Sequence, residues 1–287
     1  MRGARFVADA TPVVIAAAAV GSISQPVFGA ARRPTENPSV ALNRGLVATH
    51  AREIHAREES ASTFVPVGPG DIHRFGDQSR PDVFVAVHDL VDPVEFRMSL
   101  DIALDYPGVK FTYAPIGNLL VGANADAKER RRLNKRANKE GHRFVDHTYT
   151  HPDMTTLTLD QKVAEVLKGH RALQDALGLP YKHIGFTPPY WAGAIWGEYD
   201  AEVVQTGTLL NLSIPTTSKD SQGWNWATVE QILANVLPLA NGDIVTIHAN
   251  GKRNDIPGAL PVILEAGLQA GKRFKTLDAI PNRGVGL

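Results

Sequence analysis

Five side chains that can hold a metal ion or transfer a proton lie at or shortly after the ends of three short β-rich runs in this sequence. They are His88, Asp89, His147, His151 and His248. Two imidazoles and one carboxylate form a face that binds a divalent ion and leaves coordination positions open for water and substrate. Because several separate segments deliver these residue types, the pattern predicts one shared site.

The pair His147 and His151 is the sharpest local feature. A spacing of four residues would place both rings on one face of a helix, but Pro152 disfavours helical geometry at His151. We therefore expect a loop at a strand end, in which both rings can reach one ion. A pair of surface histidines is the alternative, because this spacing alone is a weak signal. The sequence has no cysteine, so any metal must be held by His, Asp or Glu.

Strand-like and helical patterns alternate from Pro81 to the end of the chain. This alternation predicts a parallel sheet covered by helices, either open or closed into a barrel. The carboxyl ends of parallel strands converge, and active sites form there. The expected strands cover residues 83–87, 109–114, 143–146, 183–187, 209–214 and 243–247, and the expected helices cover 94–106, 127–140, 159–177, 194–205, 228–237 and 257–270.

The overall composition excludes several classes of protein. The chain has 287 residues, of which 43% are hydrophobic, and its 30 basic and 30 acidic side chains give no net charge. Such a chain is too apolar to be disordered and long enough for one large domain or two small ones. The balanced charge gives no reason to expect a nucleic-acid partner. We interpret the basic stretch Lys128–Arg136 as a solvated helix face.

The first residues have the pattern of an export signal. Arg2 and Arg5 precede the apolar stretch Thr11–Ile23, and small residues follow. We expect a signal peptide over residues 1–29 and a secreted or cell-envelope protein; an ordinary N-terminal helix is the alternative. The stretch is too short for a stable membrane span, which takes about 20 apolar residues. The expected later parts are an extension or linker at 30–80, with a helix at 40–58, and the main domain at 81–287.

The histidine pair lies in a segment that resembles a known family. Gly141–Met154, running into Thr158–Gln161, is similar to the metal-binding motif of polysaccharide deacetylases, the NodB-homology enzymes of carbohydrate esterase family 4. The resemblance extends from Pro81 to about Ile280. It is also carried by Lys110–Tyr113 with Gly117 and Asn118 (the second strand and its exit), by Phe186–Tyr190 (the Arg-Pro-Pro-Tyr motif), by Gly242–His248 (the strand that ends in the catalytic histidine) and by Phe274–Leu277 (the closing strand).

The resemblance implies a fold, a reaction and a cofactor. The implied fold is a distorted (β/α) barrel. It would comprise residues 81–287, which would form the catalytic domain. The reaction is the removal of N- or O-linked acetyl groups from an acetylated glycan, or from a related amide or ester, and the cofactor is a divalent metal. Zinc is the expected metal, with cobalt, nickel and manganese as alternatives. The implied ligands are Asp89, His147 and His151; His248 is the implied proton donor, and Tyr190 lies at the turn that helps to hold the oxyanion.

The sequence departs from the family pattern at three positions. His88 stands where the family has the aspartate that acts as the base. Thr187 stands where the family has the arginine that orients this aspartate. In the segment Asp220–Trp224, Gly223 replaces the second carboxylate of an Asp-x-x-Asp-Trp motif, which would support the histidine acid.

The histidine at position 88 leaves two possibilities, an active hydrolase and a protein without catalytic activity. A neutral imidazole can accept a proton near neutral pH, so His88 is a candidate base. Alternatively, the protein is a pseudo-deacetylase that binds metal and glycans without hydrolysis. Asp92 could also supply a carboxylate from the following loop. A third class of function is an α/β scaffold whose histidines hold no metal.

Other residues are expected to act around this centre. Trp191 and Trp224 are candidate sugar contacts, although packing under a loop is the alternative for Trp224. Asp146 either orients His147 or caps the end of its strand. Thr187 and Asp220 are expected to support the metal ligands and catalytic histidines without contacting the substrate. The sequence does not indicate the oligomeric state.

Overall fold

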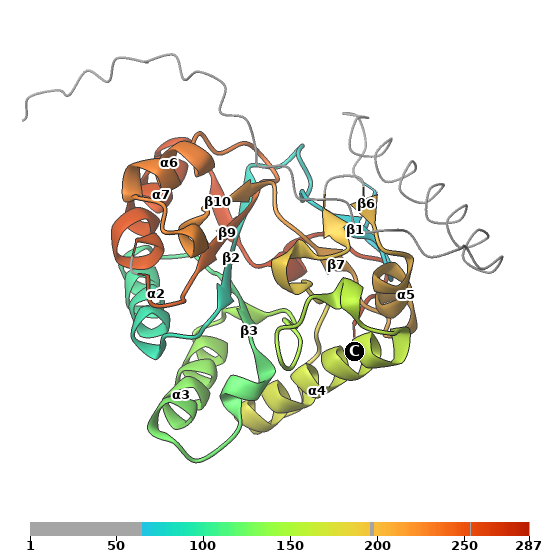
Figure 1. Cartoon of the computed structure of the whole chain (residues 1–287). Helices are drawn as coiled ribbons and strands as arrows, with labels where there is room; N and C mark the ends of the chain where they lie inside the picture. The colour runs from blue at the N-terminus through green and yellow to red at the C-terminus, as the bar shows by residue number, and fades with distance from the viewer. Residues whose placement is uncertain (1–64, 196–197, 253, 287) are drawn as a thin grey trace, which may run out of the picture. The chain divides into compact units, whose positions relative to one another are not determined.

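The computed structural model of the chain describes residues 65–195, 198–252 and 254–286 (Figure 1). The expected signal peptide at 1–29 and the expected helix at 40–58 lie outside these residues. The last part of the expected extension is described, and its short strand β1 (Ile72–His73) pairs in parallel with β7 (Ile214–Pro215).

A parallel sheet of six strands lies at the centre of the described residues (Figure 1). Its strands run in the spatial order β4, β3, β2, β9 and β8, and β10 pairs with the start of β2. Their bounds are β2 Asp82–Asp89, β3 Thr112–Pro115, β4 Arg143–Phe144, β8 Lys219–Asp220, β9 Ile244–His248 and β10 Arg273–Lys275.

Backbone pairing continues beyond this sheet. After β4, Asp146 pairs with Phe186, and Gly185 pairs with Ser213. Ser213 leads into β7 and then into β8, which pairs with β9. The chain, rather than continuous pairing, thus leads back to the centre of the sheet, and the parallel strands covered by helices confirm the predicted α/β fold class.

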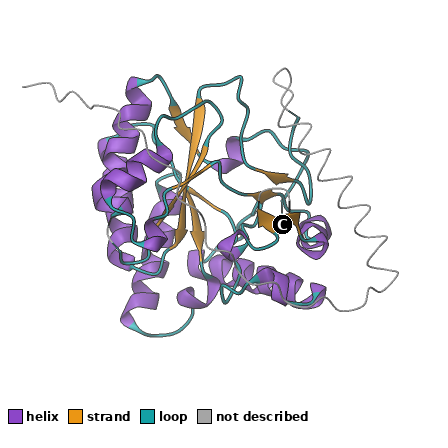
Figure 2. Ribbon diagram, turned by 45° about the horizontal axis from the view of Figure 1, so that its top comes forward, coloured by secondary structure: helices purple, strands orange, loops and turns teal. Residues whose placement is uncertain are grey.

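Helices cover the outside of the strands, as Figure 2 shows. Local capping explains several boundaries, because a side-chain oxygen at the first position satisfies free backbone N–H groups. Asp92 caps α2, Asn124 caps α3, and a capping box of Thr158 and Gln161 opens α4. The helices are α2 Pro93–Asp105, α3 Ala125–Lys139, α4 Leu159–Leu177, α5 Ala201–Leu209, α6 Val229–Val236 and α7 Leu260–Gln269, with short 3₁₀ turns at Gly117–Leu120, Met154–Thr156, Pro189–Trp191, Gly223–Asn225 and Leu277–Ala279 and a π-helical turn at Asp255–Ala259.

Three expected elements differ from the structure. The strand expected at 183–187 is not formed, and Gly185 and Phe186 make only isolated bridges, to Ser213 and Asp146. The helix expected at 194–205 is wrong in its first part, where β5 (Ala194–Ile195) and β6 (Glu198–Tyr199) form an antiparallel pair. The helix begins only at Ala201 because Asp200 accepts the N–H groups of the next turn. The strand expected at 209–214 is reduced to its end, since α5 continues to Leu209.

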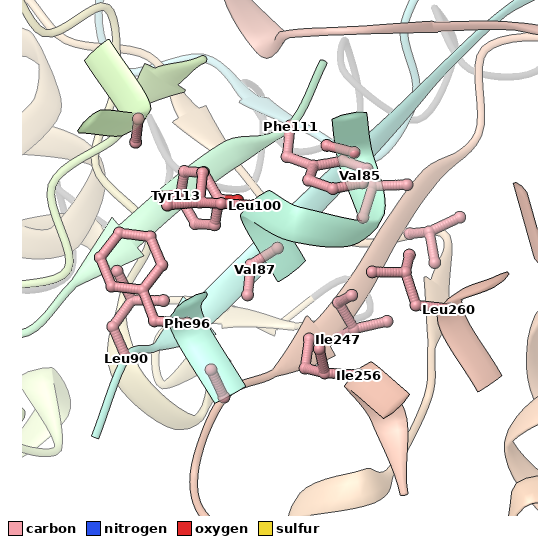
Figure 3. Close-up of a cluster of buried hydrophobic side chains, with 14 of the residues drawn as sticks. Val85, Val87, Leu90, Phe96, Leu100, Phe111, Tyr113, Ile247, Ile256 and Leu260 are labelled. Carbon is pink, nitrogen blue, oxygen red and sulfur yellow. The ribbon is translucent and has the colours of Figure 1, made fainter. Parts of the chain in front are cut away.

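The alternation of side chains along β2 and β9 positions the site. Val85 and Val87 of β2 pack with Ile247 of β9 beneath the outer helices, as Figure 3 shows. The intervening Phe84 and Ala86 belong to a second buried cluster on the other face, together with Ile244. Because strand side chains alternate with a period of two, His88 and His248 fall on this second face at the strand ends.

No helix among the described residues is long and apolar enough to cross a membrane.

Candidate metal centre and catalytic site

Asp89, His147 and His151 converge on one point, as predicted. Each offers one ligand atom, and these atoms all lie within 4.8 Å of one another. Oδ1 of Asp89 lies 3.4 Å from Nε2 of His147 and 3.3 Å from Nε2 of His151. The arrangement brings together the ends of β2 and of the segment after β4, because β2 and β4 both pair with β3.

The backbone around these ligands is strained. Positive φ angles are costly for residues other than glycine, and they persist where the surrounding fold imposes them, often at functional sites. Six non-glycine residues near the site have such angles: Asp89, Leu90, Thr148, His151, Tyr190 and Trp191. The loop geometry predicted for His151 is therefore confirmed, and its φ is 62°.

Neighbouring groups orient both histidine rings. Nδ1 of His147 lies 2.8 Å from the carbonyl oxygen of Thr187 and 2.9 Å from its hydroxyl. Nδ1 of His151 lies 3.2 Å from the hydroxyl of Tyr190. With Nδ1 engaged in each ring, Nε2 is the nitrogen that faces Asp89, and such outer contacts are typical of metal-binding histidines.

The charge states of Asp89 and His147 suit a divalent cation. Burial would raise the pKa of Asp89, but hydrogen bonding to His147 and His151 outweighs it and holds the pKa below its ordinary value. Burial lowers the pKa of His147, so its ring is neutral at neutral pH. An ionised carboxylate and a neutral imidazole are the forms that bind a metal. The residues present therefore fit a divalent ion held by Asp89, His147 and His151.

A buried arginine holds the loop that follows Asp89. The guanidinium of Arg130 donates to the carbonyl of Leu90 at 3.0 Å and also to the carbonyl of Val91. The basic stretch 128–136 is thus not solvated throughout, because Arg130 is only 6% exposed. In the same loop, Asp92 accepts the N–H of Val94 and caps α2, which gives this carboxylate a structural role.

His88 lies between the metal ligands and His248. It pairs across the sheet with His248, and its ring centroid is 4.8 Å from that of His147 and 5.9 Å from that of His248. Its Nε2 is buried and has no hydrogen-bond partner among the described residues. Burial, followed by the nearby His147 and His248, holds the pKa of His88 well below its ordinary value. A neutral imidazole whose Nε2 has no hydrogen-bond partner has the chemistry of a proton acceptor.

The pKa of His248 is shifted in the opposite direction from that of His88. Burial would lower its pKa, but the carboxylate of Asp255 and the charge of Asp89 outweigh this effect, and the pKa is raised. Oδ2 of Asp255 lies 3.6 Å from Nδ1 of His248 and accepts its backbone N–H at 2.7 Å. His88 and His248 are thus neighbours with pKa values pushed apart, the pattern expected of a base and an acid.

Aromatic side chains surround the centre. The Trp191 ring lies 5.2 Å from that of His88, and Tyr190 is 65% exposed beside His151. Trp224 is half-exposed, and its indole N–H donates to Asp220 at 3.3 Å. These positions allow Tyr190 and Trp224 to contact a ligand from solvent.

Asp146 takes the second of its two predicted roles. Its carboxylate accepts the N–H of Thr148 at 2.7 Å, as a cap at the strand end, whereas Thr187 contacts the ring of His147. Asp146 also lies 3.8 Å from Nδ1 of the buried His183. Burial raises the pKa of Asp146 well above its usual range.

Sequence reasoning missed Asp255. It follows His248 by seven residues and belongs to no motif, so nothing nearby in the sequence marks it. The one signal in the sequence was Gly223. Because it replaces the second motif carboxylate, another carboxylate was needed beside His248.

Comparison with known proteins agrees with this geometry. The profile of the family described as "Polysaccharide deacetylase" matches residues 89–213. A chitooligosaccharide deacetylase of Sinorhizobium fredii is 30% identical over 173 residues, which are 58% of this chain and 72% of that protein. A bifunctional xylanase/xylan deacetylase of Cellvibrio japonicus is 35% identical over 109 residues, which are 38% of this chain but only 15% of that protein.

Solved structures show the same fold. The structure of a CE4 family pseudoenzyme from Bacillus anthracis covers 74% of this chain, and 69% of that chain is matched, with a TM-score of 0.61 and 20% identity. The family profile, the relative in Sinorhizobium fredii and the converging Asp-His-His group lead to one conclusion. The chain belongs to the polysaccharide deacetylase family.

Proposed function

We propose that this protein is a metal-dependent hydrolase that removes acetyl groups from an acetylated glycan. The observation that carries the proposal is the convergence of Asp89, His147 and His151 beside a pair of histidines with opposed pKa shifts. Relatives that act on chitooligosaccharides and xylan support an N-acetylated or O-acetylated sugar polymer as the substrate class. Zinc is the proposed ion, because two imidazoles and one carboxylate with open positions suit it.

The residues of the chain divide the proton transfers between them. A divalent ion held by Asp89, His147 and His151 would act as a Lewis acid toward water and the acetyl carbonyl. His88 is neutral and accepts the proton of the attacking water at its free Nε2. His248, whose pKa is raised, donates a proton to the departing nitrogen or oxygen of the sugar. Tyr190 and Trp191 border the site where the acyl group and the sugar would lie.

The first prediction concerns acetate release by zinc-loaded protein. We expect release from acetylated chitin oligomers or acetylated xylan, and a fall of roughly 10²- to 10⁴-fold in His248→Ala and in His88→Ala, the usual contribution of one acid or base. Asp105→Ala, an exposed change on α2, serves as the control. The hydrolase proposal is wrong if wild type and both histidine variants release acetate at one background rate.

A pseudo-deacetylase is the second candidate, and the low pKa of His88 favours it. A base that binds protons weakly takes them from water slowly, and His88 stands where the family has a carboxylate. This candidate predicts that wild type binds acetylated oligomers without cleaving them, whereas His88→Asp gains acetate release. Acetate release by wild type that depends on His88 excludes it.

Export to the cell envelope or beyond is a separate proposal, supported by residues 1–29 alone. It predicts a mature protein that begins near residue 30. N-terminal sequencing of exported material tests it, and an intact Met1 contradicts it.

A further inference from the structure

Gly223 stands where the family motif places a second carboxylate, and the structure fills that space from another part of the chain. A Cβ atom built on Gly223 would lie 2.3 Å from Oδ2 and 2.4 Å from Oδ1 of Asp255, closer than real atoms approach. The backbone of Gly223 is not in the left-handed region, so its conformation would accept a side chain. The carboxylate of Asp255 is therefore what excludes a side chain at position 223.

Asp255 is buried and directed at His248. Its Oδ2 accepts the backbone N–H of His248 at 2.7 Å and the hydroxyl of Ser221 at 3.1 Å. The same oxygen lies 3.6 Å from Nδ1 of His248. Nδ1 of His248 and Oδ1 of Asp255 are buried without hydrogen-bond partners among the described residues. A small rotation of the ring would bring the two side chains into hydrogen-bond distance.

The other ionisable groups that face His248 are engaged elsewhere. Both oxygens of Asp220 accept hydrogen bonds from their own loop. Asp89 faces the two ligand histidines, and the ring centroid of His88 is 5.9 Å from that of His248. In the described part of the chain, Asp255 is thus the carboxylate placed to orient this imidazole.

We propose that Asp255 is the positioning residue of His248 and takes the role that the second motif carboxylate has in the family. The inference rests on the proposed function, because it gives the proton donor of that reaction its partner. Only one carboxylate fits behind His248, and it can come from position 255 or from position 223. An aspartate that merely stabilised the turn Asp255–Ala259 could not be replaced from position 223.

The test is an exchange of the carboxylate between the two positions. Asp255→Asn and Asp255→Ala are expected to lower kcat for acetate release from acetylated chitin oligomers by roughly 10- to 100-fold, with KM and zinc content unchanged. Gly223→Asp alone is expected to impair the enzyme, because two carboxylates would collide. The double variant Gly223→Asp/Asp255→Ala is expected to recover most of the lost kcat, and Asp105→Ala again serves as the surface control.

A second readout does not need turnover. The pKa of the His248 ring, followed by NMR, is expected to fall in both single Asp255 variants and to rise again in the double variant, since a nearby carboxylate favours the charged ring. If wild type releases no acetate, the proposed function fails while this readout still tests the pairing. An unchanged His248 pKa in Asp255→Asn overturns the inference, and so does a folded double variant that matches Asp255→Ala in both kcat and pKa.

Discussion

At the scale of single residues, the partner of one ring nitrogen decides what the other can bind. Nδ1 of His147 faces the carbonyl and hydroxyl oxygens of Thr187. A carbonyl oxygen only accepts, so Nδ1 carries the proton and Nε2 keeps its lone pair for a metal. Thr187 thus orients the ring of His147. In the family, an arginine at this position orients the aspartate that acts as the base.

This contact predicts how two substitutions change zinc affinity. His147→Ala removes a ligand and is expected to weaken zinc binding by more than the roughly 10- to 100-fold usual for an outer contact. Thr187→Val removes the hydroxyl but keeps the carbonyl, so its loss is expected to stay within about 10-fold. Competition with a chelator of known affinity measures both. Stoichiometric zinc bound with wild-type affinity by His147→Ala would contradict the ligand assignment.

At the scale of elements, a buried histidine links neighbouring strands of the sheet. His142 precedes β4, its Nδ1 accepts the N–H of Phe111 at 3.0 Å, and its ring stacks on that of Phe111. Burial, with help from Lys110 and Arg136, lowers the pKa of His142 to about 4. The folded element therefore requires a neutral ring.

The sign of the resulting pH dependence follows from linkage. Between pH 6.5 and about 4 the unfolded chain binds a proton at His142 and the folded chain does not, so stability falls as the pH falls. If the whole shift in the pKa of His142 is realised, the free energy of unfolding falls by about 3 kcal/mol as the pH falls through this range. We expect His142→Gln to lose less stability than wild type between pH 7 and pH 4.5 in urea unfolding. Parallel pH profiles of the two proteins would contradict this role.

At the scale of the whole molecule, the candidate metal ligands come from parts of the chain that are distant in sequence. Asp89 ends β2, while His147 and His151 follow β4, and α2 and α3 lie between them. An ion bound to the folded form but not to the unfolded form stabilises the entire domain.

Zinc is therefore expected to raise the thermal midpoint. At about 100 times its Kd the gain is about 2.7 kcal/mol, which corresponds to a rise of roughly 5 to 10 °C for a domain of this size. Asp89→Asn is the matched variant, because asparagine tolerates the positive φ at this position. It is expected to lose most of the rise in a thermal scan with and without zinc. An equal rise in both proteins would place the ion elsewhere.

The reach of sequence-based prediction differs between elements for physical reasons. The helix 159–177 was predicted to the residue, since a capping box and a terminal glycine act locally. The helix expected at 194–205 failed at its start, because the cap at Asp200 and the pairing of β5 with β6 took precedence over helical periodicity.

The sequence by itself predicted that an aspartate and two histidines would converge at the strand ends. His147, His151 and Pro152 are close in the chain, and the period of two in β2 and β9 carries His88 and His248 to one face. Only the tertiary structure decided which carboxylate supports His248. The pairing of β8 with β9 brings the turn at Gly223 against the segment after His248, and no local pattern records a contact between side chains that meet only after the strands have paired.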